Sequence, residues 1–245
     1  DRRRLPLGPS QGPPGRRRLT LDKSSTFEAH RGHLTGIAYR MLGSWSDAED
    51  VVQEAFIRFA AATGVRDPRG FLTTVTTRLA LDALRSARRR REEYVGQWLP
   101  EPIVERAGFW EHGAEASARD ASLALLVALE RLTPLERAVF ILHDVFDMGF
   151  DEVAATLGRN EAACRQLAVR ARGHVREARP RAPVPPEQAS RVTEAFFAAA
   201  SSGDTAALRE LLAGDAVLVS DGGRRRFAAI NPIRGADPIA RFYGG

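Results

Sequence analysis

A set of arginine and amide side chains lies between residues 160 and 177, where it could contact nucleic acid. Small and apolar residues recur there at helical spacing and predict a buried stripe of Cys164, Leu167, Ala168, Ala171 and Val175. Arg165 can donate two hydrogen bonds to guanine, and Gln166 can pair with adenine. The other arginines can neutralise phosphates. We therefore predict a DNA-reading surface made of Arg165, Gln166, Val169, Arg170, Arg172 and Arg176.

The residues before this surface predict the first helix of a helix-turn-helix. An apolar stripe at helical spacing consists of Phe150, Val153, Ala154 and Leu157. Gly158 suits a left-handed end for that helix, and Asn160 can cap the next one. In a helix-turn-helix the second helix enters the major groove. The coincidence of turn, stripes and arginine face favours DNA binding over an ordinary solvated helical pair.

A second set of charged residues is acidic and follows residue 46. Ser46 and Glu49 have the spacing of a capping box at the start of a helix. Behind them an apolar stripe of helical period consists of Ala48, Val51, Val52, Ala55, Phe56 and Phe59. The opposite face exposes Asp47, Asp50, Glu54 and Arg58. This pattern predicts an amphipathic helix with an acidic face that is either solvated or bound to a basic partner.

The segment from residue 71 to residue 91 is ambiguous by propensity. Residues 72–77 are rich in threonine and favour a strand, whereas residues 78–91 favour a helix. Arg85 and residues 88–91 form a basic run. Local basic patches of this kind, more than the overall charge, are the mark of a nucleic-acid-binding protein.

Composition excludes several classes of protein. The formal net charge of +5 is carried by residues 1–18, which hold six arginines and one aspartate, so the remainder sums to zero. No apolar run approaches the roughly 20 residues that span a bilayer, so we expect a cytoplasmic protein. The single cysteine excludes an internal disulfide. His30 and His33 have metal-like spacing without further ligands, so we expect both side chains to be solvated and predict no metal and no cofactor.

The order of segments predicts several units. Residues 1–25, rich in Arg, Pro and Gly, are expected to be a disordered arm, and residues 95–120 a linker that contains "WLPEP". Thr133, Pro134 and Glu136 predict the start of a helix within the unit at 121–180. After a proline-rich linker at 181–187, residues 188–245 predict helices at 188–201 and 205–212, strands at 217–220 and 225–230, and a helix at 242–245.

Three stretches resemble one protein family. "SDAEDVVQEAFIRF" is similar to the helix by which bacterial sigma factors bind the polymerase clamp, and "PRGFLTTVTTRLALDALRSARRRRE" is similar to the sigma segment that follows it. "TPLERAVFILHDVFDMGFDEVAATLGRNEAACRQLAVRARGHV" resembles the fourth sigma region. The chain is thus identified as resembling the extracytoplasmic-function sigma factors. Its "WLPEP" linker and its appended C-terminal unit further resemble the subgroup that carries a fused SnoaL-like domain.

This resemblance implies a mainly α fold: sigma region 2 at 26–94, a region 4 helix-turn-helix at 121–180, and a partial α+β SnoaL-like cone at 188–245. It implies a factor that binds core RNA polymerase and promoter DNA and is not itself an enzyme. No phosphate-binding loop, nucleophile elbow or acid/base pair is found outside the last unit. The alternatives are an α+β enzyme or ligand sensor with a helical DNA-binding front end, and a plain helix-turn-helix repressor.

The resemblance also assigns residues to surfaces. The polymerase-binding residues would be Asp47, Glu49, Asp50, Gln53 and Glu54. The minus-ten DNA-binding residues would be Thr73, Thr74, Thr77, Arg78, Arg85, Arg88 and Arg89, and residues 71–91 would be helical. The arginine-faced helix would bind the minus-thirty-five element. In that subgroup the fused unit contacts a regulatory linker, here Trp98, Leu99, Pro100, Glu101 and Pro102, and an incomplete unit would do so only in part.

The C-terminal unit is expected to be incomplete. The unit has about 58 residues from residue 188 onward, whereas the SnoaL-like domains that it resembles have roughly 100–150 residues. Half of its sheet should then be absent, and its two strands should have unpaired edges. We predict that this unit is sensitive to proteases.

Overall fold

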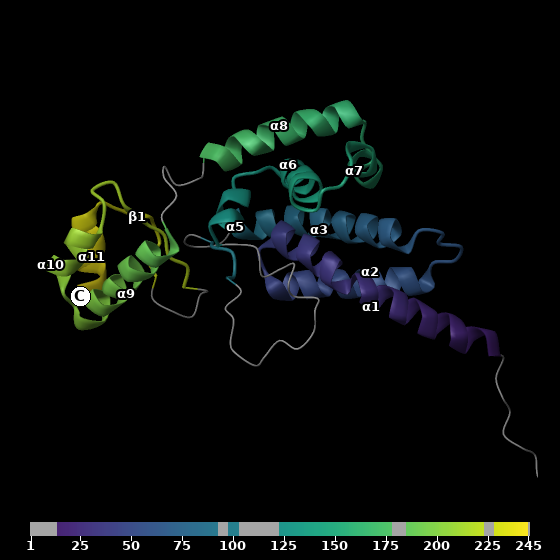
Figure 1. Cartoon of the computed structure of the whole chain (residues 1–245), viewed down its shortest axis with the longest axis horizontal. Coiled ribbons are helices and arrows are strands. Elements are labelled where there is room, and N and C mark those ends of the chain that lie inside the picture. The colour runs from purple at the N-terminus through teal and green to yellow at the C-terminus, as the bar shows by residue number, and fades with distance from the viewer. Residues whose placement is uncertain (1–13, 93–97, 103–122, 178–184, 223–227, 245) are drawn as a thin grey trace, which may run out of the picture.

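The structure is a computed structural model, and it describes residues 14–92, 98–102, 123–177, 185–222 and 228–244. The helices between residues 14 and 177 form successive layers (Figure 1). α1 (Pro14–Leu42) and α2 (Trp45–Ala61) pack on one side of α3 (Pro68–Glu92). α6 (Pro134–Val139) and α7 (Phe150–Leu157) pack between α3 and α8 (Glu161–Glu177). The predicted mainly α fold class is confirmed.

The first helix corrects the expected boundary of the N-terminal arm. α1 begins at Pro14, so residues 14–25 are helical and not part of a disordered arm; residues 1–13 lie outside the described residues. Proline is tolerated in the first turn of a helix, and arginine and leucine are good helix formers. The early start brings Lys23 against the end of α2.

The second helix has a different cap from the predicted one. Ser44, and not Ser46, is the N-cap residue, and its hydroxyl accepts a hydrogen bond from the Asp47 amide at 3.4 Å. Gly43 precedes it with a φ of +68°, a conformation that glycine adopts without strain. Ala48, Val51, Val52, Ala55 and Phe59 of α2 are buried, as their period predicts.

The ambiguous threonine-rich segment is helical throughout in α3, as the family resemblance implies. Leu72, Ala80, Leu81 and Leu84 are buried at helical spacing. Packing of these residues in the core outweighs the intrinsic preference of threonine for strands, because tertiary contacts regularly override propensity.

Within the described residues 123–177, four short helical segments precede one longer helix. They are α5 (Leu123–Leu129), α6, a π-helical segment η2 (Phe140–Val145), α7 and α8. Thr133 and Glu136 form the predicted capping box of α6. Gly158 ends α7 with a φ of +63°, and the Asn160 side chain accepts a hydrogen bond from the Ala163 amide at 2.8 Å. The expected turn between the two helices of the helix-turn-helix is therefore present.

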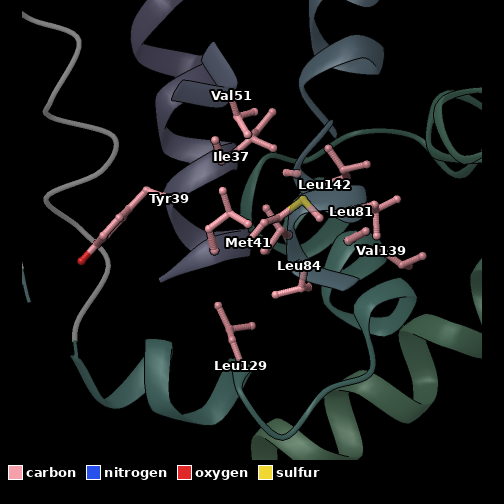
Figure 2. Close-up of a cluster of buried hydrophobic side chains, with 14 of the residues drawn as sticks. Ile37, Tyr39, Met41, Val51, Leu81, Leu84, Leu129, Val139 and Leu142 are labelled. Carbon is pink, nitrogen blue, oxygen red and sulfur yellow. The ribbon is translucent and has the colours of Figure 1, made fainter. Parts of the chain in front are cut away.

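One continuous hydrophobic cluster joins the helices on both sides of the linker. Figure 2 shows side chains of this cluster, which come from α1, α2, α3, α5, α6 and η2 and include Ile37, Tyr39, Met41, Val51, Leu81, Leu84, Leu129, Val139 and Leu142. The two helical units that the sequence predicts as separate domains thus share one core in this conformation.

The C-terminal unit differs from its prediction in the second strand and the last helix. It contains α9 (Pro186–Ser202), α10 (Thr205–Leu211), β1 (Val217–Leu218), β2 (Ile233–Arg234) and α11 (Ala236–Gly244). The second strand is β2 and does not include residues 228–230; residues 223–227 lie outside the described residues. The last helix begins at 236, and α9 already begins within the expected proline-rich linker.

A small separate core holds this unit together. β1 and β2 are antiparallel, with Val217 opposite Arg234 and Leu218 opposite Ile233. The buried cluster consists of Ala199, Leu208 and Ala240, with Phe196, Ala200 and Ala207 packed against it. Gly235, with a φ of +92°, separates β2 from α11. This turn explains why the strand is short and the helix starts early.

None of the described helices has both the length and the apolar character that a membrane span requires.

Candidate functional site

The acidic face of α2 borders a groove against α1. Glu49, Asp50 and Gln53 are exposed and line this groove, whose volume is about 860 Å³. Its apolar wall includes Phe27 and Phe56, whose ring centroids are 4.8 Å apart. A groove with an apolar wall and a carboxylate rim suits a protein partner with basic and apolar side chains.

The two other predicted polymerase-binding residues lie at the ends of this face. Asp47 is half-buried in the first turn of α2. Glu54 is also half-buried, and its carboxylate pairs with Arg58 at 2.8 Å within the same helix. The structure thus brings all five predicted residues onto α2, but only three of them line the groove.

The outer face of α8 carries the predicted DNA-reading residues. Arg165, Gln166, Val169, Arg170, Arg172 and Arg176 are all exposed, and Val169 is 66% exposed. The opposite face buries Cys164, Leu167, Ala168, Ala171 and Val175. Burial raises the pKa of the Cys164 thiol, which agrees with a packed apolar role for this residue.

Three of these arginines contact carboxylates within the chain. Arg165 pairs with Glu161 at 2.6 Å, and Arg172 pairs with Asp144 at 2.6 Å. Arg170 lies 3.5 Å from the carboxylate of Glu136. Because these arginines are 42–62% exposed, the pairs contribute little to stability and can exchange for phosphate oxygens.

Glu136 is the most buried of these carboxylates. Burial acts to raise its pKa, but hydrogen bonds from the backbone and hydroxyl of Thr133, together with the charges of His174 and Arg170, hold the pKa below its ordinary value. Glu136 therefore remains ionised at neutral pH. It caps α6 and orients Arg170 at the same time.

A stack of rings supports Arg165. The guanidinium carbon of Arg165 lies 5.3 Å from the ring centroid of Phe150. The ring of Phe150 also packs against that of His143, with the two ring centroids 3.9 Å apart. His143 Nδ1 lies 2.7 Å from the carbonyl oxygen of Met148, which fixes the imidazole. These contacts limit the positions that Arg165 can adopt on the surface.

The predicted minus-ten residues on α3 are not all accessible at the surface of the structure. Thr73 and Thr77 are buried, with exposed fractions of 2% and 0%, and Thr74 is half-buried. The reason is that α3 is covered on two sides, by α1 and α2 and by α6 and α7. In this conformation the two threonines are not accessible to DNA.

The arginines of α3 are less covered. Arg78 is exposed, but its Nε donates a hydrogen bond to the carbonyl oxygen of Thr156 in α7 at 3.2 Å. Arg85 is exposed and lies 3.4 Å from Asp82. The side chains of Arg88 and Arg89 lie outside the described residues.

Polar contacts cross the boundary between the first three helices and the later ones. Arg137 is 2% exposed, and its NH1 donates hydrogen bonds to the Met41 carbonyl oxygen and the Glu130 carboxylate, each at 2.8 Å. The ring of Phe146 meets that of His33 edge-on at 4.8 Å and lies 5.3 Å from the Arg40 guanidinium carbon. His33 is thus half-buried at this boundary and not a solvated side chain.

The "WLPEP" segment contacts the C-terminal unit, as predicted. The Leu99 amide donates a hydrogen bond to the Asp221 carboxylate at 3.0 Å. In the same segment Pro100 is buried, and Glu101 contacts the corner between α1 and α2. Among the described residues, no group of three or more His, Cys, Asp or Glu side chains could hold a metal ion.

Comparison with protein families identifies both helical units. Residues 26–90 match the family model of Sigma-70 region 2, and residues 122–175 match that of Sigma-70, region 4. The two matches occur in the order in which the two candidate surfaces occur along the chain. The chain belongs to the extracytoplasmic-function (ECF) RNA polymerase sigma factors.

Individual relatives support this membership. The chain is 44% identical over 224 residues to the ECF RNA polymerase sigma factor SigJ of Mycobacterium tuberculosis, a match that covers 90% of this chain and 72% of SigJ. It is 42% identical over 202 residues to the probable ECF sigma factor SigI of the same species, covering 77% of this chain and 66% of SigI. The crystal structure of SigJ superposes with a TM-score of 0.70 at 40% identity, covering 89% of this chain and 73% of that one.

Several residues that the structure places beside these surfaces were not predicted from the sequence. Asp144 and Glu136 hold arginines of α8, and no local pattern signals those contacts, because the partners are 28 and 34 residues apart. Lys23 and Glu101 contact the two ends of α2. A signal for Lys23 was available, since it is the only lysine in the chain.

Proposed function

We propose that this ECF sigma factor binds core RNA polymerase through the acidic face of α2 and places α8 in the major groove of the minus-thirty-five element. The family directs polymerase to promoters, and it is non-enzymatic as a class. Polymerase carries out the chemistry of initiation. Because bacterial polymerase works in the cytoplasm, we place this protein there as well. The observation that carries the proposal is the separation of an acidic face on α2 from a basic face on α8.

On the polymerase side, Asp47, Glu49, Asp50, Gln53 and Glu54 form the contact surface. The exposed carboxylates of Glu49 and Asp50 stand at the rim of a groove whose wall is apolar. Complementary charges accelerate association and set orientation, while apolar contacts at the centre of an interface supply affinity. The groove between α1 and α2 offers both.

On the promoter side, four outward residues of α8 border one shallow depression of about 420 Å³: Arg165, Gln166, Val169 and Arg170. Arg165 and Gln166 are suited to base edges, and Val169 to a thymine methyl group. Arg170, Arg172 and Arg176 are suited to phosphates. The intramolecular carboxylates are displaced from these arginines when DNA binds.

The minus-ten element is the proposed target of α3, through Thr73, Thr74, Thr77, Arg78, Arg85, Arg88 and Arg89. Thr73 and Thr77 are buried under neighbouring helices, and Arg78 is bound to Thr156. We therefore infer that α6 and α7 move away from α3 before these residues bind the melted strand. The shared core and the Arg137 contacts are lost in that step.

The C-terminal unit is proposed to be regulatory. It contacts the segment of Trp98, Leu99, Pro100, Glu101 and Pro102 through Asp221. This segment also contacts the corner before α2. A fused unit that holds the linker can influence how the two sigma regions separate. No feature of the described residues favours an enzyme or ligand sensor as the main function.

Charge reversal on α2 tests the polymerase contact. We expect the variant Asp47→Lys, Asp50→Lys and Glu54→Lys to lose core polymerase binding, because an acidic contact face requires a basic partner surface and like charges would then oppose each other. Holoenzyme formation and promoter-directed transcripts with purified core polymerase are measured. Circular dichroism checks that the helix is retained.

A matched control reverses three exposed carboxylates of the C-terminal unit, at Glu187, Glu194 and Glu210. This control has the same net charge, and it should bind core polymerase like the unchanged protein. Holoenzyme formation by the α2 variant at unchanged affinity would refute the polymerase assignment.

A further inference from the structure

The C-terminal end of α2 is held by a cation from α1. Lys23 Nζ donates hydrogen bonds to the carbonyl oxygens of Phe59 at 3.1 Å and Ala60 at 3.0 Å, and also to that of Ala62. These carbonyls belong to the last turn of α2 and to its C-cap residue, where no further helical amide follows. A positive charge at this end also matches the negative end of the helix dipole.

The residue type at position 23 fits this site. Lys23 is the only lysine in a chain that otherwise uses arginine for its long basic side chains. An ammonium group is compact and has three rotatable donors, so it can meet three carbonyls that converge on one point. The planar guanidinium of arginine directs its donors outward in a fixed fork. The ammonium also lies 5.6 Å from the ring centroid of Phe59.

The N-terminal end of α2 is held by a carboxylate from the linker. Glu101 Oε2 accepts a hydrogen bond from the Trp45 amide, the first in α2, at 2.8 Å. The backbone of Glu101 is fixed as well: its amide donates to the Gly43 carbonyl oxygen at 2.8 Å, and the Tyr39 hydroxyl donates to its carbonyl oxygen. A negative charge is favourable at this end of the helix.

The linker fits closely against the corner that precedes α2. A Cβ atom placed on Gly43 would lie 2.8 Å from the ring of Trp98 and 3.2 Å from Cβ of Pro100. Gly43 therefore meets two requirements, a positive φ and a close approach by the linker. Pro100 is buried at this contact. The position of Glu101 is thus set by the packing of Trp98 and Pro100 against Gly43 and by the hydrogen bonds of its own backbone.

We propose that Lys23 and Glu101 are positioning residues for polymerase docking. They hold α2 from its two ends, with charges of the sign that each end favours, and so fix the orientation of the acidic face that carries Glu49 and Asp50. Neither side chain is part of that face. The proposal rests on the proposed function of α2 as the polymerase contact, and it adds that α1 and the "WLPEP" segment belong to the docking unit.

The test uses the full chain with two disruptive variants and two conservative ones. Lys23→Met and Glu101→Ala remove a cap, whereas Lys23→Arg retains the charge and Glu101→Gln retains an acceptor oxygen. Glu210→Gln, an exposed carboxylate on α10, is the control. Hydrogen exchange of the α2 amides is measured in the free protein, and affinity for core polymerase is measured by titration.

We expect each disruptive variant to exchange the amides at its own end of α2 about fivefold faster and to bind core polymerase about fivefold more weakly, as for the loss of a helix cap. Glu101→Gln should recover most of the binding, and Lys23→Arg only part of it. The control should change neither measurement. Because the conservative variants keep a polar group in place, they report on positioning even where a disruptive variant loses stability.

Two results would overturn the proposal. One is unchanged exchange in α2 for all four variants, which would mean that the caps do not hold the helix. The other is faster exchange with unchanged affinity for core polymerase, which would mean that holding the helix does not matter for docking. A failure of the proposed function gives a different result from either of these. The triple lysine variant of α2 would then retain polymerase binding, while the Lys23 and Glu101 variants would still show faster hydrogen exchange in α2.

Discussion

His33 shows how a single side chain depends on the contact between the two helical regions. Its ring lies edge-on against Phe146 of the later helices, at a centroid distance of 4.8 Å. Burial, together with the charges of Arg69 and His30, lowers its pKa from 6.5 to about 4. The imidazole is therefore neutral in the folded protein at pH 7 and remains neutral at pH 5.

This lowered pKa predicts a pH dependence of stability. Between pH 6.5 and pH 4 the unfolded chain binds a proton at His33 that the folded protein does not, so the free energy of unfolding falls as the pH falls through this window. We expect a loss of about 1–3 kcal/mol. Urea unfolding at pH 7 and pH 4.5 measures it.

Substitution of His33 isolates its contribution to the pH dependence of the free energy of unfolding. In His33→Gln the loss between the two pH values should be smaller by about 1–3 kcal/mol, because no imidazole is left to titrate. His30→Gln removes only the last of the three causes that lower the His33 pKa, so this variant should keep most of the pH dependence. An equal pH dependence in the unchanged protein and in His33→Gln would contradict the prediction.

At the scale of the element, the exposed face of α8 carries two arginines, Arg165 and Arg172, that differ in their contacts. Arg165 is held by Glu161 and by the ring of Phe150, so its guanidinium has a restricted position. Arg172 is paired with Asp144 and lies two turns further along the helix. Of these two arginines, Arg165 has a ring contact in addition to its carboxylate partner, so we infer that Arg165 reads a base, which requires a defined geometry, and that Arg172 holds a phosphate.

Alanine substitution distinguishes these tasks. Arg165→Ala should cost about 1–3 kcal/mol of binding free energy at one base position and relax specificity there. Arg172→Ala should weaken binding to all sequences about equally. It should also reduce by about one the slope of the logarithm of the binding constant against the logarithm of the salt concentration. Both are measured by binding to a set of single-base promoter variants at several salt concentrations. A uniform loss for Arg165→Ala would show that the helix is oriented differently in the groove.

At the scale of the whole molecule, two cores of unequal size coexist. One cluster unites the helices between residues 27 and 175, whereas the C-terminal cluster has three buried residues. In the described part of the C-terminal unit the sheet has two strands of two residues each, and such a ribbon is marginal by itself. Its contact through Asp221 to the linker is therefore expected to matter for its stability.

This difference predicts the order of proteolysis. Limited digestion should remove the unit after residue 184 before the helices of the large core are cut, because local unfolding is easier where fewer apolar groups are buried. Asp221→Ala should accelerate this removal, and Glu194→Ala, an exposed residue of α9, should not. Mass spectrometry of the fragments over time gives the rates. A C-terminal fragment that resists digestion would show that this unit is stable by itself.

The sequence alone determined the elements whose signals are local. The apolar period and the caps at Thr133, Gly158 and Asn160 predict α6, α7 and α8 and the exposed face of α8, because these contacts join residues a few positions apart. The tertiary structure decided the rest. Burial of Thr73 and Thr77 and the capping of α2 by Lys23 and Glu101 depend on packing between distant segments. Such contacts leave no periodic pattern, since their partners lie tens of residues away in the chain.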